Sequence, residues 1–232
     1  MIFSFVPLTL GQMEKPATAV WKFEETDSQI SDSGRNGNKG KLVNENNVKR
    51  IPGKSGKALA FTPETKKNGS AVIPGIAGKY DFFTKGITIE AWIKMNSSFK
   101  RQLTYEIVSN SNGGKGFRLL ISWGKICFRS GGGGKEGKTW QASSNPSTHQ
   151  VKPEIWHHIA AVYDGSVFKV YLDGELVGKS EKDLVLSSGI KDLYIGAYGN
   201  GSTNGFDGAI DEMKIYDYPR SDLQILQDAK IE

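Results

Sequence analysis

Short runs of apolar residues, separated by turn residues, recur along the chain after residue 17. Runs of this kind, rich in β-branched and aromatic side chains, predict strands. The expected strands cover 17–23, 57–61, 70–74, 86–95, 105–109, 116–123, 125–129, 138–143, 156–163, 167–172, 175–180, 192–197 and 209–216. Their regular spacing is typical of a β-sandwich or β-barrel.

Turn and helix signals complete this pattern. Asp164-Gly165 and Asp173-Gly174 are the strongest hairpin signals, because Asp-Gly readily adopts the positive φ angles of a tight turn. The glycine- and asparagine-rich stretches 34–47 and 196–205 are expected to be surface loops. One short helix is predicted at the C-terminus, where Ser221 and Gln224 have the spacing of a capping box.

The chain reads as a single domain over 18–232, preceded by a leader at 1–17. The leader contains an apolar run, Ile2–Leu10, of about the length of a signal-peptide core, but lacks a basic start. We interpret it as a truncated signal, and therefore expect a secreted, cell-surface or periplasmic protein. The alternative is an apolar leader that packs on the domain. No apolar run is long enough for a membrane span.

Composition indicates a globular protein with a modest positive charge. The chain has 232 residues, of which 38% are hydrophobic, and a net charge of +5. Basic residues are concentrated in 35–67 and acidic residues in 203–232. These segments are either ordinary solvated surface or, for 35–67, a patch for an acidic glycan. Nucleic acid is not an expected partner, because no nucleic-acid-binding module accompanies the lysines. The single Cys127 excludes an intrachain disulfide.

The stretch GGGKEGKT at 132–139 matches the G-x-x-x-x-G-K-[ST] pattern of a phosphate-binding loop. Such a loop needs a helix directly behind it, so that the helix N-terminus faces the phosphates. The following residues contain Pro146 and Pro153 and begin as a strand instead. We therefore expect a glycine-rich hairpin tip and no nucleotide.

Residues suited to catalysis are not grouped. His157 and His158 are neighbours on a predicted strand, so their side chains should point to opposite faces, one inside and one on the surface. The same argument separates Asp211 from Glu212. An enzyme is therefore not the favoured interpretation, although it stays open.

Three segments carry a family resemblance: ITIEAWIK at 87–94, WHHIAAVYDGSVFKVYLDGELVG at 156–178 and GFDGAIDEMKIYDYPRSDLQI at 205–225. They closely resemble concanavalin A-like, laminin-G-like domains. The resemblance implies an all-β fold, a two-sheet antiparallel jelly-roll sandwich. It leaves three functions open. We favour a lectin-like module that binds a glycan non-covalently. The alternatives are a protein-binding adhesion module, with cell-surface proteins as partners, and a polysaccharide lyase or glycosidase.

The family often carries a structural calcium ion, and the chain has oxygen donors for one. Asp32 and Asn36 lie in a tight turn of the kind that supplies ligands to hard cations. By resemblance, Asp211 would be the third ligand, and the ion would join the N- and C-terminal segments. The alternative is an Asx turn at Asp32 and a salt-bridged or capping Asp211.

A sugar site needs aromatic rings and planar polar groups. The predicted ligand-binding residues are Arg118, Trp123, Arg129, Trp140, Tyr198 and Asn200. Trp123 and Trp140 are either platforms for a sugar or core residues, the commoner role in this fold. Trp21, Trp92 and Trp156 lie in apolar strands, so we assign them to the core.

Overall fold

The protein is described by a computed structural model. The described residues are 14–64, 67–80, 85–97, 100, 103–111, 115–130, 140–181, 189–199 and 203–230, with the side chains of 140 and 181 excluded. Most of the predicted leader, the 132–139 motif and Asn200 therefore lie outside the described residues.

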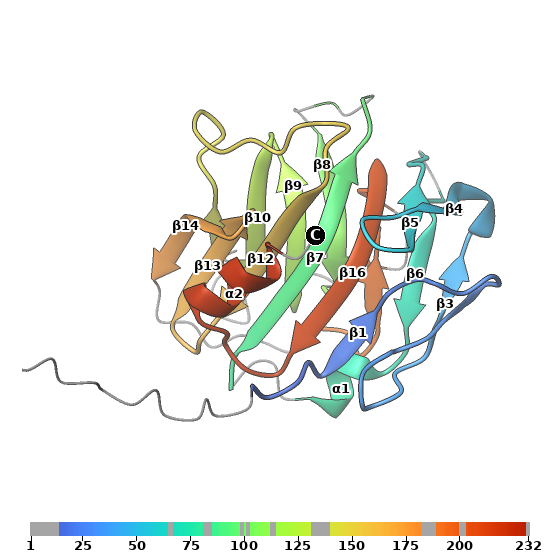
Figure 1. Cartoon of the computed structure of the whole chain (residues 1–232), viewed down its shortest axis with the longest axis horizontal. Helices are drawn as coiled ribbons and strands as arrows, with labels where there is room; N and C mark the ends of the chain where they lie inside the picture. The colour runs from blue at the N-terminus through green and yellow to red at the C-terminus, as the bar shows by residue number, and fades with distance from the viewer. Residues whose placement is uncertain are drawn as a thin grey trace, which may run out of the picture.

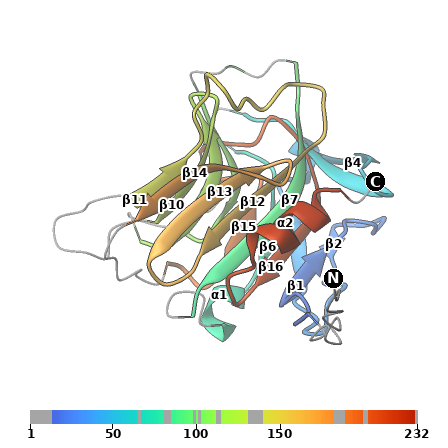
Figure 2. The ribbon, with the colours of Figure 1, turned by 60° about the vertical axis from the view of Figure 1, so that its left-hand side comes forward.

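Two antiparallel sheets face each other (Figures 1 and 2). Sheet A has the order β14-β13-β12-β7-β16-β5-β4, and β1 also pairs with β16. Its strands are β1 Ala19–Trp21, β4 Val48–Pro52, β5 Lys57–Phe61, β7 Ile87–Met95, β12 His157–Tyr163, β13 Val167–Leu172, β14 Glu175–Glu181 and β16 Gly208–Tyr216. The C-terminal strand β16 thus lies between β7 and β5, inside the sheet rather than at its edge.

Sheet B has the order β11-β10-β9-β8-β15-β6-β3-β2. Its strands are β2 Gln29–Ile30, β3 Gly40–Val43, β6 Ser70–Ile73, β8 Thr104–Ser109, β9 Phe117–Ser122, β10 Lys125–Ser130, β11 Trp140–Ser143 and β15 Leu193–Ile195. The expectation that 34–47 is a loop is wrong, because β3 lies within it. Gly40 makes that pairing possible, since a Cβ there would lie 2.5 Å from the Val72 carbonyl oxygen.

Helical structure is short in the described part of the chain. It consists of a 3₁₀ turn η1 Glu45–Asn47, a single turn α1 Ile76–Lys79 and the C-terminal α2 Asp222–Asp228. Ser221 and Gln224 form the predicted capping box, and α2 lies across the outer face of sheet A (Figure 1). None of the described helices is long and apolar enough to cross a membrane. The prediction of an all-β, two-sheet sandwich with a short C-terminal helix is confirmed.

The core lies between the sheets because alternate residues of each strand are apolar. On β7, Ile87, Ile89, Ala91, Ile93 and Met95 face inward and are fully or almost fully buried. The intervening side chains face outward and form the external surface of sheet A. A smaller apolar cluster on that surface seats α2 through Ile225. The predicted Asp-Gly hairpins are present, with Asp173 and Gly174 both at positive φ.

A buried carboxylate connects β16 to the loop between β4 and β5. One carboxylate oxygen of Asp211 accepts the backbone N–H groups of Lys54 at 2.8 Å and Ser55 at 3.0 Å, and the other accepts that of Glu212. Asp211 has no exposed surface. Burial raises its pKa to about 6, the nearby Glu212 carboxylate adds to this rise, and the N–H donors offset part of it.

Asp211 should make the free energy of unfolding fall as the pH rises from about 4 to about 6. A carboxyl group whose pKa is higher in the folded protein takes up a proton on folding in this window, so stability is lost as it ionises. We expect this contribution to be roughly 2–3 kcal/mol, and to be absent in Asp211→Asn. Urea unfolding at several pH values measures both profiles. Parallel profiles for the two proteins would contradict the assignment.

Candidate functional site

Two of the predicted arginines lie side by side on the outer face of sheet B. Arg118 on β9 and Arg129 on β10 are directly paired residues of neighbouring strands. The Arg118 guanidinium donates to the Glu106 carboxylate of β8, with Nε 3.0 Å from Oε1 and Nη2 2.6 Å from Oε2. This two-point contact fixes the plane and the direction of the guanidinium.

Tyr198 completes this cluster from the loop that follows β15. Its ring centroid lies 4.3 Å from Cζ of Arg118, which is cation–π geometry. The loop runs along β8, because the Glu106 backbone N–H donates to the Asn204 carbonyl. Three of the predicted ligand-binding residues, Arg118, Arg129 and Tyr198, thus lie close together in the structure. We call them, together with Glu106, the sheet B cluster.

Glu106 was missed by the sequence analysis. It is fully buried, and burial raises its pKa even though Arg118 stabilises the ionised form. The sequence could have revealed Glu106 because it is the single acidic residue within the largely apolar strand 104–109. Its pairing with Arg118 depends on the register of β8 and β9, which a bulge shifts between Glu106 and Val108.

Arg129 is half-buried, as Arg118 is. Its Nε donates to the Gln141 side chain of β11 at 2.7 Å, and Gln141 itself is exposed. The cluster thus offers two half-buried guanidinium groups, one of them held by a buried carboxylate, and one aromatic ring. Planar donors and a ring are the groups that hold hydroxyl- or carboxylate-bearing ligands.

Trp123 lies apart from the sheet B cluster. It occupies the β9–β10 turn, five residues from Arg118, which corresponds to roughly 16 Å along a strand. It is 66% exposed, so a core role is wrong. Its φ of 54° is rare for a non-glycine residue, because Trp123-Gly124 forms a tight turn in which both residues have positive φ. Trp140 lies on β11, but its side chain is outside the described set.

Two other assignments need correction. Trp21 is buried as expected, but Trp92 and Trp156 are only partly buried. Trp92 takes an outward position on β7, which the alternation rule should have assigned. The prediction of one interior and one surface histidine is also wrong, since both are buried. His157 is held by Asp173 at 2.8 Å, and His158 lies 3.3 Å from Glu90.

The predicted calcium ligands serve separate turns. Asp32 accepts the backbone N–H groups of Val20, Gly34 and Asn38, which is the Asx-turn alternative. Asn36 donates to the Thr18 carbonyl, and Asp211 makes the contacts given above. N–H groups thus already donate to the oxygens of both carboxylates. The described residues contain no group of three or more Asp, Glu, His or Cys arranged for a metal. These contacts give no support to a shared ion, and calcium stays a prediction.

The basic segment 35–67 is partly neutralised within the fold. Arg50 donates to the backbone carbonyls of Phe23 and Gln29 and pairs with Glu25 at 3.3 Å. Lys57 donates to the Glu24 carbonyl. These cations stabilise the N-terminal loops, so the segment is not one continuous patch of free charge.

Comparison with known families identifies the fold family. The model of the concanavalin A-like lectin/glucanases superfamily matches residues 66–226. The chain belongs to this superfamily. No curated protein matches the sequence.

Solved structures with the same fold include a domain of an arabinanase and the binding domains of two toxins. Domain 4 of AbnA, an extracellular GH43 arabinanase from Geobacillus stearothermophilus solved with arabinotriose, has 20% identity and a TM-score of 0.69. The match covers 92% of this chain and 98% of that one. The binding domain of Paraclostridial Mosquitocidal Protein 1 has 17% identity and a TM-score of 0.72. The binding domain of botulinum neurotoxin DC, solved in complex with rat synaptotagmin II, has 14% identity and a TM-score of 0.70. The match covers 92% of this chain and 51% of either toxin domain, so the chain spans about half their length. At these identities the likeness concerns the fold alone.

Removing Arg118 should destabilise the protein in a pH-dependent way. Arg118→Met leaves the Glu106 carboxylate buried without its partner, which typically costs about 3–5 kcal/mol near pH 7. The loss should be smaller at pH 5, because the pKa of Glu106 rises further and the folded variant takes up a proton there. Urea unfolding at both pH values measures this effect.

The double variant Glu106→Gln/Arg118→Met should recover most of the loss. Arg129→Met is the matched control, because Gln141 is exposed and uncharged, and should cost under about 1 kcal/mol. Equal losses for Arg118→Met and Arg129→Met would show that the buried carboxylate is not the cause.

Proposed function

We propose that the chain is a non-enzymatic glycan-binding module whose site is the sheet B cluster. The observation that carries the proposal is the Arg118 guanidinium, oriented by Glu106 and stacked on Tyr198. A polar group that is already held in place loses little entropy when a ligand binds, which favours recognition of weakly binding sugars.

The chemistry of the cluster fits a sugar. Hydroxyl groups need both donors and acceptors, which the exposed Gln141 side chain supplies. Sugar carboxylates pair with guanidinium groups such as that of Arg129. The solved neighbour with arabinotriose supports a sugar ligand by analogy of fold. We also keep export and a structural calcium ion as proposals for a module of this kind.

Protein binding is the second candidate. Trp123 and Leu103 are 66% and 48% exposed, and the Trp123 backbone N–H donates to the Leu103 carbonyl at 3.3 Å. An exposed tryptophan beside an exposed leucine is typical of a protein-binding hot spot. The neighbour in complex with synaptotagmin II supports this candidate by analogy of fold.

A glycan array with neutral and acidic sugars should show binding that depends on the sheet B cluster. Arg129→Ala and Tyr198→Ala should each weaken binding by about tenfold or more, since each removes a contact worth about 1.5 kcal/mol or more. Binding to acidic sugars should weaken with salt. Trp123→Ala is the matched control and should bind normally. Loss of binding in Trp123→Ala alone would contradict the proposed site.

The calcium proposal is tested by adding EDTA during thermal unfolding. A bound structural ion stabilises the folded protein, so chelation should lower the Tm in the wild type. Asp32→Asn should have a Tm that no longer responds to EDTA. An unchanged Tm for the wild type would refute the metal and leave glycan binding untouched.

A further inference from the structure

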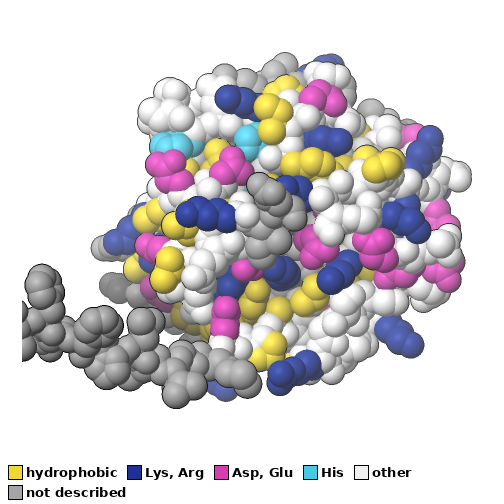
Figure 3. Space-filling view, in the orientation of Figure 1, with side chains coloured by type: hydrophobic (Ala, Val, Ile, Leu, Met, Phe, Trp, Pro, Cys, Tyr) yellow, Lys and Arg dark blue, Asp and Glu magenta, His cyan; other side chains and the backbone are white. Residues whose placement is uncertain are grey.

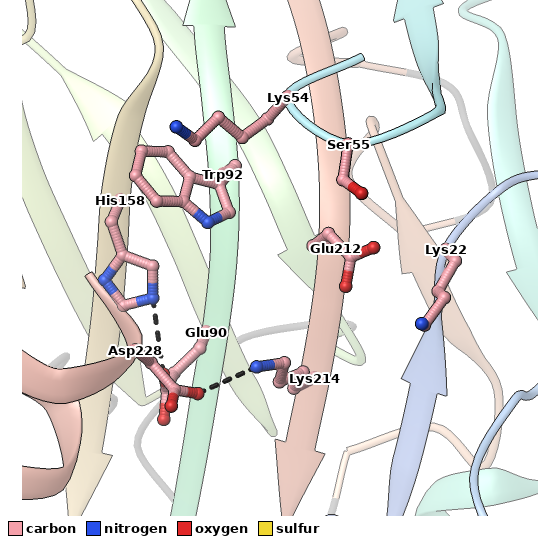
Figure 4. A pocket seen from close by; sticks show the side chains of 9 residues that line it. All are labelled: Lys22, Lys54, Ser55, Glu90, Trp92, His158, Glu212, Lys214 and Asp228. Carbon is pink, nitrogen blue, oxygen red and sulfur yellow. Dashed lines mark hydrogen bonds and ion pairs between the residues drawn. The ribbon is translucent and has the colours of Figure 1, made fainter. Parts of the chain in front are cut away.

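A polar pocket opens on the outer face of sheet A, on the opposite side of the sandwich from the sheet B cluster (Figure 4). We call it the sheet A pocket. Its volume is about 210 Å³. Its lining residues are Lys22, Lys54, Ser55, Glu90, Trp92, His158, Glu212, Lys214 and Asp228. Figure 3 shows positive and negative side chains interspersed over this face.

Two backbone features shape the pocket. A bulge between Asp211 and Lys214 interrupts the pairing of β16 with β7, and Glu212 adopts a φ of 46° there. Because of the bulge, the side chains of Asp211 and Glu212 do not point to opposite faces of the sheet as expected. Asp211 binds the β4–β5 loop, and Glu212 lines the pocket. The loop held by Asp211 places Lys54 and Ser55 at the pocket edge (Figure 4). Bulges and strained residues are enriched at functional sites.

One side of the pocket is made of side chains that already have partners. Lys214 pairs with Asp228 at 2.8 Å. Arg220, behind the pocket, pairs with Asp228 at 3.0 Å and with Glu90, and His158 lies 3.3 Å from Glu90. These ion pairs balance the charge of this wall, although His158 Nδ1 and Glu90 Oε2 have no hydrogen-bond partner among the described residues.

The other side carries groups with no hydrogen bond or ion pair within the described structure. They are the ammonium of Lys22, the hydroxyl of Ser55, the carboxylate of Glu212 and the indole N–H of Trp92. The Lys54 ammonium lies 4.5 Å from the Trp92 ring centroid and has no carboxylate partner there either. Figure 4 shows the side chains of Lys22, Glu212 and Trp92 around the same space.

This donor set selects a small anion that also carries hydroxyl groups. The Lys54 ammonium, which lies over the Trp92 ring, suits a carboxylate. Glu212 accepts hydroxyl donors but repels a compact dianion such as sulfate or phosphate. The indole adds apolar surface for a sugar ring, and the volume is below the ~300–1,000 Å³ of pockets for drug-sized ligands. We propose that the sheet A pocket binds one hexuronate unit, with its carboxylate toward Lys54 and its hydroxyls toward Glu212 and Ser55. This proposal does not rest on the sheet B cluster.

The test is a titration of the ¹⁵N-labelled protein with D-glucuronate, followed through the indole N–H signals, with the Trp92 signal assigned by Trp92→Phe. D-Glucuronate should shift the Trp92 signal, while D-glucose and sulfate should not. Lys54→Met should weaken binding by about tenfold or more, because it removes a charge-assisted contact. Lys49→Met is the matched control, since Lys49 is an exposed lysine on the adjacent β4. It should bind like the wild type.

Further variants separate this site from its rivals. Glu212→Gln should lower the preference for D-glucuronate over sulfate by about tenfold, because it removes the repelling charge. Arg129→Ala and Tyr198→Ala should leave D-glucuronate binding at Trp92 unchanged, even if they abolish glycan-array binding. The affinities of galacturonate and trigalacturonate are compared in the same titration. Equal affinities would identify the end of a polysaccharide chain as the ligand, and weaker binding of trigalacturonate would identify the free monosaccharide.

Three results would overturn the proposal. The first is no Trp92 shift with D-glucuronate in a folded protein. The second is a response to sulfate as strong as the response to D-glucuronate. The third is equal weakening by Lys49→Met and Lys54→Met, which would show a nonspecific effect of charge.

Discussion

The buried Asp211 carboxylate is the constraint on which the arrangement of sheet A depends. It accepts backbone N–H groups from the β4–β5 loop and from its own strand, and so connects residues more than 150 positions apart. A buried charge is tolerated only when hydrogen bonds replace water, so the loop and the bulge must keep their positions together. Gly53 allows this close approach, since a Cβ there would lie 2.4 Å from the Asp211 carboxylate. The resulting bulge re-aims Glu212 and makes the outer surface of β16 hollow rather than flat.

The two outer faces of the sandwich use charge differently. On sheet B, a buried carboxylate orients a guanidinium that stacks on an aromatic ring, so the polar groups are fixed before a ligand arrives. On sheet A, a network around Arg220 neutralises one wall, and Lys22 and Lys54 have no acidic partner among the residues that the structure describes. The charged groups on sheet B come from the consecutive strands β8, β9 and β10, whereas the sheet A pocket combines residues from both ends of the chain.

Much of the fold could be predicted from the sequence, because alternation and Asp-Gly turns report local geometry. The strand expected at 86–95 and the helix after Ser221 are present. Short strands such as β3 were missed, since their pairing depends on a close approach at Gly40 that local pattern does not reveal. The grouping of Arg118 with Tyr198 could be proposed, but Glu106 could not, because strand register decides its contact. Trp92 shows the opposite case, in which an aromatic residue in an apolar strand was assigned inward although its position in the alternation points outward.

Cys127 lies on the outer face of sheet B beside Arg129 and is the chain's only cysteine. Its thiol is almost fully buried, and burial raises its pKa. Oxidants and disulfide exchange act on accessible thiolates, and this sulfur is neither accessible nor readily ionised. With this single cysteine the sandwich has no intrachain disulfide, so its stability should be indifferent to the redox potential of its surroundings. A domain of the same fold that depends on a disulfide bond loses stability when its surroundings become reducing.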